Sequence, residues 1–320
     1  MKIPWVGNNK GIWAALSSAF LLGFAPIFGK QAINLGFSPL AVAALRTSMA
    51  AGILFILLTI FKRSSLFIYP AGLLGCILAG AINGIGSLFY YLAIERLGVS
   101  IGQLLFSLYP VFLIMWFLIE RTLPSRLTFL RLFLSIIGVI LITSFKSLEI
   151  DWLGVGLMLA ASCLYAVHLP INQRVLYDVP PPTVTLYTLL AMSAVTAPLA
   201  LIFGSKIPSD VSAWQPLFFM TIVMVLSRLL LFMGVKHLGG IQTALLGISE
   251  LLVSLLISYF WLGETLQPIQ WVGSILLFIS ILLISAEKIR PETYRTQSTV
   301  LLRWLTPPDS PGRTPWGPDQ

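Results

Sequence analysis

Charged residues are scarce in this chain. Only 10% of its 320 residues are Asp, Glu, Lys or Arg, and 57% are hydrophobic, whereas roughly a quarter of a soluble domain is charged. This composition excludes a soluble enzyme, a disordered protein and a nucleic-acid-binding module. Because the chain is too apolar to be water-soluble, we interpret its net charge of +8 as a signal of membrane orientation.

Residues that commonly carry catalysis or bind metals are also few. The sequence has two histidines, His168 and His237, and two cysteines that both lie in apolar runs. No cluster of His, Cys and carboxylates has the spacing of a metal site, and Gly23–Lys30 differs from a phosphate-binding loop in spacing and in the residue that follows it. We therefore expect no catalytic residues, no metal and no cofactor.

Long hydrophobic runs dominate the chain instead. A transmembrane helix needs about 20 mostly apolar residues, and charges and turn residues divide the sequence into ten such segments. We predict helices over 11–29, 39–61, 70–92, 98–119, 127–145, 152–171, 183–204, 214–235, 239–262 and 268–286. The fifth is the weakest, since it spans only if Arg126 and Arg131 reach back to the interface. Residues 1–10 and 287–320 are expected to form tails, the second of them disordered.

Lysine and arginine are distributed unevenly between the two sides of this topology. If the N-terminus is cytoplasmic, fourteen of them fall on the cytoplasmic side, against four on the outside and two inside helices. This is a strong positive-inside bias. We expect a multi-pass protein of a plasma (inner) membrane with both termini in the cytoplasm.

Matching glycines and prolines divide the ten helices into two groups of five. The pairs, 141 to 144 residues apart, are Gly11 and Gly154, Pro26 and Pro170, Pro39 and Pro182, and Leu97-Gly98 and Leu238-Gly239. Because each group holds an odd number of helices, the second must lie inverted in the bilayer, as in many transporters. We predict an all-α polytopic membrane protein in which 11–145 and 152–286 form two inverted five-helix repeats.

Across about residues 11–286 the chain resembles the drug/metabolite transporter superfamily, EamA-type. The resemblance is carried by Ala44-Leu45-Arg46, Pro110-Val111-Phe112, Ser249-Glu250 and Trp261-Leu262-Gly263-Glu264-Thr265-Leu266. It implies ten helices in a five-plus-five inverted arrangement, cytoplasmic ends, and export of amino acids or other metabolites. The first half has Tyr109 where the second half has Glu250, so the resemblance implies no symmetric role for the glutamates.

Three ionisable residues, Arg46, Arg228 and Glu250, lie inside predicted helices, where a charge costs about 2.5–3.5 kcal/mol on insertion scales. Arg228 and Glu250 differ in depth by roughly 6 Å at the rise of a helix. We hypothesise that they pair and line a central cavity; a purely structural pair, or an Arg228 that extends to the cytoplasmic face, is the alternative. Glu250 is also the candidate for exchanging a proton for substrate, and Arg46 either extends outward or contributes to binding.

Neutral polar residues supply further candidates for the cavity. Asn83, which lies between two glycines that permit close helix packing, either bonds to a neighbouring helix or faces the cavity. Tyr90, Tyr109 and His168 are weaker candidates, and His168 could instead bond a carbonyl freed by the nearby proline. Further weak candidates are Gln103, Tyr165 and Gln242, of which the two glutamines are expected to satisfy backbone groups at the membrane interface.

Together these features favour a secondary transporter that moves a small organic metabolite, an amino acid or a similar solute, by alternating access. The expected partners are the lipid bilayer, the solute, and a proton or counter-solute, with no nucleic acid. A passive facilitator or channel of the same fold and a non-transporting membrane scaffold are the alternatives. An intramembrane enzyme would need convergent carboxylates or histidines, which the sequence does not supply.

Overall fold

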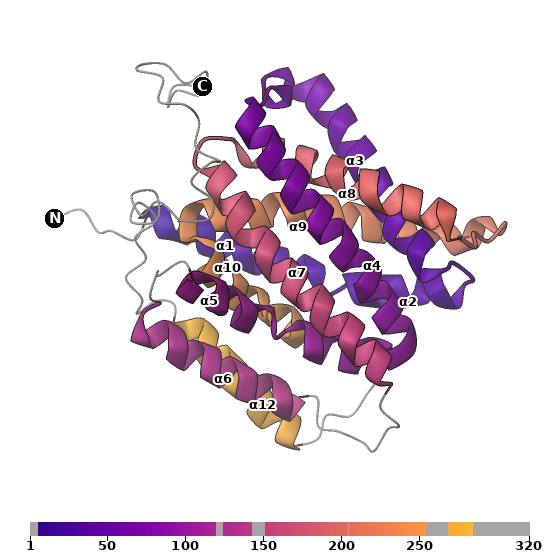
Figure 1. The fold of residues 1–320 in the computed structure, drawn as a ribbon. Coiled ribbons are helices and arrows are strands. Elements are labelled where there is room, and N and C mark those ends of the chain that lie inside the picture. Colours follow the sequence, from indigo (N-terminus) through magenta and orange to yellow (C-terminus); the bar gives the residue numbers. More distant parts are fainter. Residues whose placement is uncertain (1–5, 120–123, 143–150, 204, 254–267, 284–320) are drawn as a thin grey trace, which may run out of the picture.

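The computed structural model describes residues 6–119, 124–142, 151–203, 205–253 and 268–283, and in these it is helical, without strands (Figure 1). The α-helices are α1 (Val6–Leu22), α2 (Ala25–Asn34), α3 (Pro39–Phe61), α4 (Pro70–Phe106), α5 (Tyr109–Ile119), α6 (Arg126–Ile142), α7 (Trp152–Leu176), α8 (Pro181–Ile202), α9 (Trp214–Leu238), α10 (Gly240–Gly247) and α12 (Pro268–Leu282). Two short 3-10 helices, η1 (Arg63–Leu66) and η2 (Val211–Ala213), precede α4 and α9. The predicted tail 287–320 lies outside the described residues.

Six described helical segments are long and apolar enough to cross a membrane. They are Asn9–Asn34, Pro39–Phe61, Pro70–Val99, Trp152–Leu176, Pro181–Ile202 and Val211–Leu238, with shorter apolar helices at Tyr109–Ile119, Gly240–Val253 and Trp271–Ser280. Large apolar side chains such as Phe61 and Leu201 are 79% and 82% exposed on the outside of the bundle. An outer surface of this kind is stable in lipid but not in water.

The main helix contacts join the first half of the chain to the second. α4 packs against α7 and α8, α1 against α9, and α3 against α8, while α6 and α12 lie side by side at one edge of the bundle (Figure 1). Within the α3–α8 contact the hydroxyls of Thr47 and Thr196 are 2.9 Å apart, and those of Ser48 and Ser193 are 2.6 Å apart. Such hydrogen bonds matter in lipid, because apolar contact with lipid competes with apolar contact between helices.

Capping residues explain where several helices begin. Ser38 precedes Pro39 and accepts a hydrogen bond from the amide of Ala41 at 3.3 Å, so α3 starts where a serine cap and a first-turn proline coincide. Asp151 caps α7 through the amides of Leu153 and Gly154, at 2.9 and 3.1 Å. The predicted limits 39–61 of the second helix are confirmed at both ends.

Three predicted helices are interrupted along their length, a feature that the sequence did not predict. The first is broken at Gly23–Phe24, between α1 and α2. The fourth is broken at Ser107–Leu108, between α4 and α5, and the ninth turns at Ile248 after α10. Each break leaves backbone groups without their helical partners, and such groups are tolerated at membrane depth where they are buried in protein or line a cavity.

The junctions before the fourth and ninth predicted helices have nearly the same backbone geometry. Gly98 has φ 76° and ψ 173°, a non-helical conformation at a kink that joins two helices within the range of α4, and Gly239, 141 residues later, has φ 84° and ψ 165° between α9 and α10. A positive φ of this kind is easily adopted only by glycine. The predicted boundary at 97–98 is thus confirmed as a break between two helices, and its counterpart in the second half has nearly the same conformation.

Arg131 does not reach the membrane interface, contrary to the prediction. Its side chain is fully buried: Nε donates to the carbonyl of Ser280 at 3.0 Å, and Nη1 donates to Oε1 of Gln242. Gln242, expected at the interface, also donates to the hydroxyl of Thr128 at 3.3 Å. This network joins α6, α10 and α12, because the arginine finds carbonyl acceptors on neighbouring helices that the sequence does not reveal.

Candidate functional site

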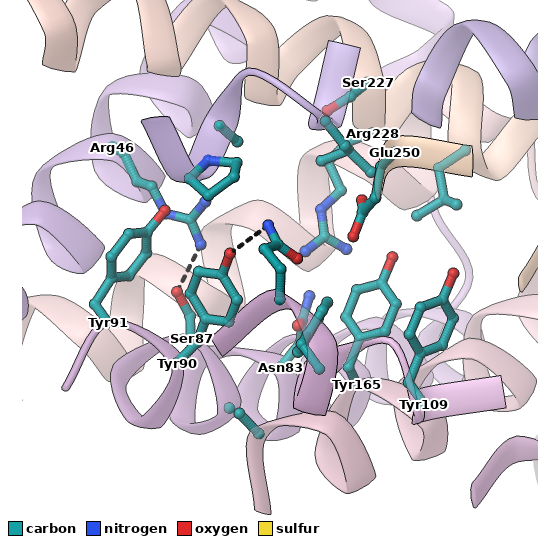
Figure 2. A pocket seen from close by; sticks show the side chains of 18 residues that line it. Arg46, Asn83, Ser87, Tyr90, Tyr91, Tyr109, Tyr165, Ser227, Arg228 and Glu250 are labelled. Carbon is teal, nitrogen blue, oxygen red and sulfur yellow. Dashed lines mark hydrogen bonds between the residues drawn. The ribbon is translucent and has the colours of Figure 1, made fainter. Parts of the chain in front are cut away.

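A polar cavity of about 700 Å³, its mouth included, lies between the two halves of the chain (Figure 2). Its polar lining comprises Arg46, Asn83, Ser87, Tyr90, Tyr91, Gln103, Tyr109, Tyr165, Ser227, Arg228 and Glu250. These residues come from α3, α4, α5, α7, α9 and the segment after α10. Because the 700 Å³ includes open space at the mouth, the enclosed part of the cavity is much smaller.

Six of the seven predicted site residues line this one cavity: Arg46, Asn83, Tyr90, Tyr109, Arg228 and Glu250. His168 does not line it but lies behind Arg228, in contact with the guanidinium. Their role in binding a solute stays a prediction. Ser87, Tyr91 and Ser227 also line the cavity and were not predicted, because short polar side chains and tyrosines are too common in membrane helices to stand out in a sequence.

Arg228 is buried and bonded to neutral partners rather than to Glu250. Its Nη1 donates to Nε2 of His168 at 3.2 Å, and Nη1 and Nη2 donate to the amide oxygen of Asn83 at 2.9 and 2.6 Å. The hypothesised ion pair with Glu250 is therefore not found, although both residues line the cavity. Arg228 projects from α9 toward Asn83 of α4 and His168 of α7 instead.

The contacts of His168 determine which of its nitrogens carries the proton. Nε2 accepts from Arg228, which can only donate, and Nδ1 contacts the carbonyl of Tyr165, which can only accept. The ring is therefore neutral, with its proton on Nδ1. His168 thus connects the Arg228 guanidinium to the backbone of α7.

Arg46 lies at the other end of the cavity and does not extend to the outer surface. Its Nη2 donates to the hydroxyl of Ser87 at 2.6 Å, and its guanidinium carbon is 4.8 Å from the centre of the Tyr91 ring (Figure 2). The contact with the ring is a cation–π interaction. The Nε atom is buried and has no hydrogen-bond partner among the described residues.

Gln103 was expected to satisfy backbone groups at the membrane interface, but it lines the cavity. Its Nε2 donates to the hydroxyl of Tyr90 at 3.0 Å, whereas its Oε1 is buried and has no partner among the described residues. The ring of Tyr90 lies between Tyr91 and Phe106, with ring centres 5.1 and 5.0 Å away. Here the cavity wall contains aromatic rings and one buried acceptor, Oε1 of Gln103, to which no described residue donates.

Glu250 follows the break in the ninth helix, and Tyr109 stabilises that break. The amide of Ile248 bonds the carbonyl of Leu246 rather than that of Ala244. The carbonyl of Ala244 instead accepts a 2.7 Å hydrogen bond from the hydroxyl of Tyr109. Glu250 thus lies two residues after a turn that a residue of the first half holds in place.

Matching positions of the two halves line the cavity. Gly86, Ser87, Tyr90 and Tyr109 line it from the first half, and the residues 141 positions later, Ser227, Arg228, Leu231 and Glu250, line it from the second. The same backbone positions therefore face the cavity in both halves, but they carry different chemistry. The second half supplies an arginine and a glutamate where the first supplies a serine and a tyrosine.

The described residues show no alternative centre of metal or acid–base chemistry. Within them, no group of three or more His, Cys, Asp or Glu side chains could hold a metal ion. Both described histidines bond backbone carbonyls, His168 to Tyr165 and His237 to Met233.

Comparison with known proteins identifies the family. The sequence profile of the EamA-like transporter family matches twice, over residues 9–144 and 152–286. An uncharacterized transporter of Archaeoglobus fulgidus is 26% identical over 196 residues, which cover 61% of this chain and 70% of the relative.

A solved crystal structure of another protein shares the fold. Its TM-score is 0.70 at 14% identity, and the match covers 88% of this chain and 96% of that one. The predicted membership of the EamA-type drug/metabolite transporters is thereby confirmed. The chain belongs to the EamA-like transporter family and is a multi-pass membrane transporter built from two repeats of that family.

Proposed function

We propose that the protein is a secondary transporter that exports a small organic metabolite, an amino acid or a similar solute, by alternating access. The observation that carries this proposal is the cavity lined from matching positions of both repeats. It holds two arginines and a glutamate inside the helix bundle, where each charge is costly and suggests a function. The comparisons support transport in general, and the cavity supports a polar organic solute.

The proposed architecture has ten helices in two inverted five-helix repeats. The cross-half contacts support it, since α4 with α7 and α1 with α9 each pair the third helix of one repeat with the first of the other. The equal geometry at Gly98 and Gly239 supports it too. In such an arrangement, exchange of the conformations of the two repeats exposes the central cavity to the other side.

We place the protein in the plasma membrane with both termini in the cytoplasm. The support is the excess of Lys and Arg on one side of the ten-helix topology. A reporter fused after Gln320 tests this placement: activity of a cytoplasm-dependent reporter is expected, and activity of a periplasm-dependent reporter contradicts it.

Proton coupling through Glu250 is part of the proposal. Its carboxylate is 7% exposed and lies in the central cavity, where it could exchange a proton for solute. In Glu250→Gln we expect uphill transport to be lost and the pH dependence of exchange to flatten. Normal activity with an unchanged pH profile would remove this role.

Counterflow in proteoliposomes tests the function. Vesicles are loaded with single amino acids, nucleobases or sugars, and uptake of the labelled solute is measured with and without the purified protein. Saturable exchange accelerated from the opposite side supports a carrier. Flux without acceleration supports a passive facilitator, and absence of flux for the whole panel supports a non-transporting scaffold.

A further inference from the structure

Two side chains of the cavity lining, Arg46 and Gln103, each carry a polar atom that the described protein leaves unused. Nε of Arg46 is a buried donor and Oε1 of Gln103 is a buried acceptor, and neither has a hydrogen-bond partner among the described residues. Both side chains line the cavity, and Gln103 is only 4% exposed. Buried polar groups are normally satisfied, so these two atoms point to a ligand that brings an acceptor and a donor.

The positive charge of Arg46 also has no negative charge paired with it among the described residues. The recorded contacts of Arg46 are the neutral groups of Ser87 and Tyr91, and no described salt bridge includes it. At the opposite end, the terminal nitrogens of Arg228 already donate to Asn83 and His168. The guanidinium of Arg46 keeps a buried Nε–H without an acceptor among the described residues, and this donor could bind an anion. Guanidinium groups bind carboxylates with strong, charge-assisted hydrogen bonds.

Aromatic rings surround these two atoms. Tyr90 lies edge-on to Tyr91, with ring planes at 84°, and at 71° to Phe106. Figure 2 shows Arg46, Ser87 and Tyr91 together, with Tyr90 between this group and the group formed by Arg228, Glu250, Tyr165 and Tyr109. A ligand whose polar head lies at Arg46 would thus place its apolar part against tyrosine and phenylalanine rings.

We propose that Arg46 and Gln103 form the polar-head subsite for a small organic monoanion that carries an O–H or N–H donor beside its carboxylate. Nε of Arg46 donates to the carboxylate, and Oε1 of Gln103 accepts from the neighbouring donor. The net charge of the ligand follows from the site, because the Arg46 end is cationic and without a counter-ion. The subsite rests on the proposed transport function, because we take its ligand to be the transported solute.

Three ligands that share a phenyl group on a two-carbon chain test the subsite on the unmodified protein. Phenyllactate has both the carboxylate and the adjacent hydroxyl, 3-phenylpropanoate lacks the hydroxyl, and 2-phenylethylamine replaces the anion by a cation. Calorimetric titration of the protein in lipid nanodiscs should give a Kd for phenyllactate roughly tenfold below that for 3-phenylpropanoate, because a site built for a hydroxyl rejects the analogue without it. The amine should not bind. Equal affinities of the two acids, binding of the amine, or no binding at all would overturn the proposal.

Substitutions separate the two contacts. Gln103→Met should raise the Kd for phenyllactate about tenfold, to that of 3-phenylpropanoate, and leave the second value unchanged. Arg46→Gln should weaken both acids by about tenfold or more, and Arg46→Lys, which keeps the charge but loses Nε, should weaken both by less. Gln31→Met changes an exposed glutamine outside the cavity and serves as the control. The assignment is contradicted if the control loses the preference for phenyllactate over 3-phenylpropanoate. It is also contradicted if Gln103→Met keeps that preference.

Counterflow on the same preparation distinguishes the two proposals. If the acids bind without discrimination while some solute of the panel shows saturable exchange, the subsite is wrong and the transport function stands. If phenyllactate is preferred as expected but neither it nor any panel solute crosses the bilayer, the subsite stands and the transport function is wrong.

Discussion

The hydroxyl of Tyr109 donates a 2.7 Å hydrogen bond to the carbonyl of Ala244, so a residue of the first repeat satisfies the backbone of the interrupted helix in the second. The residue that corresponds to Tyr109 in the second repeat is Glu250, which follows the same break. Tyr109 therefore supports the turn that precedes Glu250, its matching residue in the second repeat.

Removing this hydroxyl should destabilise the protein. In Tyr109→Phe the buried carbonyl of Ala244 loses the hydroxyl that donates to it. A buried unsatisfied group of this kind costs about 1–3 kcal/mol. Tyr165→Phe is the matched control, since no hydrogen bond of its hydroxyl is found in the described part of the chain and its ring packs 4.9 Å from that of Tyr109. Unfolding in detergent monitored by circular dichroism measures both. Equal stability of the two variants would contradict the role of the bond.

Asn83 should stabilise the protein through Arg228. Asn83→Leu keeps the volume but removes the oxygen that accepts from both terminal nitrogens, and hydrogen bonds to charged groups are worth about 1.5–3 kcal/mol. In an Arg228→Met background the same change should cost less than half as much. A double-mutant cycle on the free energy of unfolding tests this coupling, and additive effects would show that the two side chains do not interact.

Gly80 should be sensitive to the smallest substitution. A Cβ atom at this position would lie 2.5 Å from Cβ of Ala191 and 2.6 Å from the carbonyl oxygen of Thr188, so α4 and α8 would have to separate. Overpacking of this kind costs about 1–3 kcal/mol. Gly52→Ala, on the exposed face of α3 with open space around it, should instead be neutral or stabilising because alanine favours helix. Thermal unfolding compares the two, and a tolerated Gly80→Ala would contradict the close helix contact.

The cap of α7 should make stability depend on pH in the acid range. The amide of Gly154 and then the guanidinium of Arg96 hold the pKa of Asp151 below its ordinary value. A lowered pKa means that the folded state favours the carboxylate. The stabilisation is therefore complete above the ordinary aspartate pKa and is lost as pH falls through the lower folded value.

Asp151→Asn tests this pH dependence, because asparagine keeps the cap but loses the 3.0 Å salt bridge to Arg96. The difference in unfolding midpoint between the wild type and this variant should be constant at neutral pH and shrink below pH about 4. Asp151→Ala should be less stable than Asp151→Asn at neutral pH. A difference that grows on acidification would contradict the assignment of the lowered pKa.

Local signals predicted much of the fold. Ser38 and Pro39 define the start of α3, and the apolar run ends at Lys62, so both limits of 39–61 are determined by residues at the ends of the helix. Gly98 was recognised as a boundary, and its non-helical conformation confirms a break between two helices there. The direction of the chain after such a break depends on packing, which the sequence does not contain.

The candidate site was predictable by residue type but not by contact. A buried ionisable group is costly wherever it lies, so Arg46, Arg228 and Glu250 could be selected from the sequence alone. Their partners could not, because the rotation of α9 about its axis directs Arg228 to His168 and Asn83. Ser87 could have been found by shifting Arg228 back by 141 residues, since matching positions of both repeats face the cavity.

The accessibility of the cavity tests the central claim most directly. Ala25 is half-buried, lines the cavity and is small enough for Ala25→Cys to be tolerated. Cys76 and Cys163 are replaced by serine, and a membrane-impermeant thiol reagent is applied to right-side-out and inside-out vesicles. Gly52→Cys, on the lipid-facing side of α3, is the control and should not react from either side.

An alternating-access transporter exposes its central cavity to each side in turn. The account predicts that Ala25→Cys is labelled from both faces of the membrane and that a transported solute slows the reaction. Labelling from one face only, at a rate that no solute of the counterflow panel changes, would contradict it.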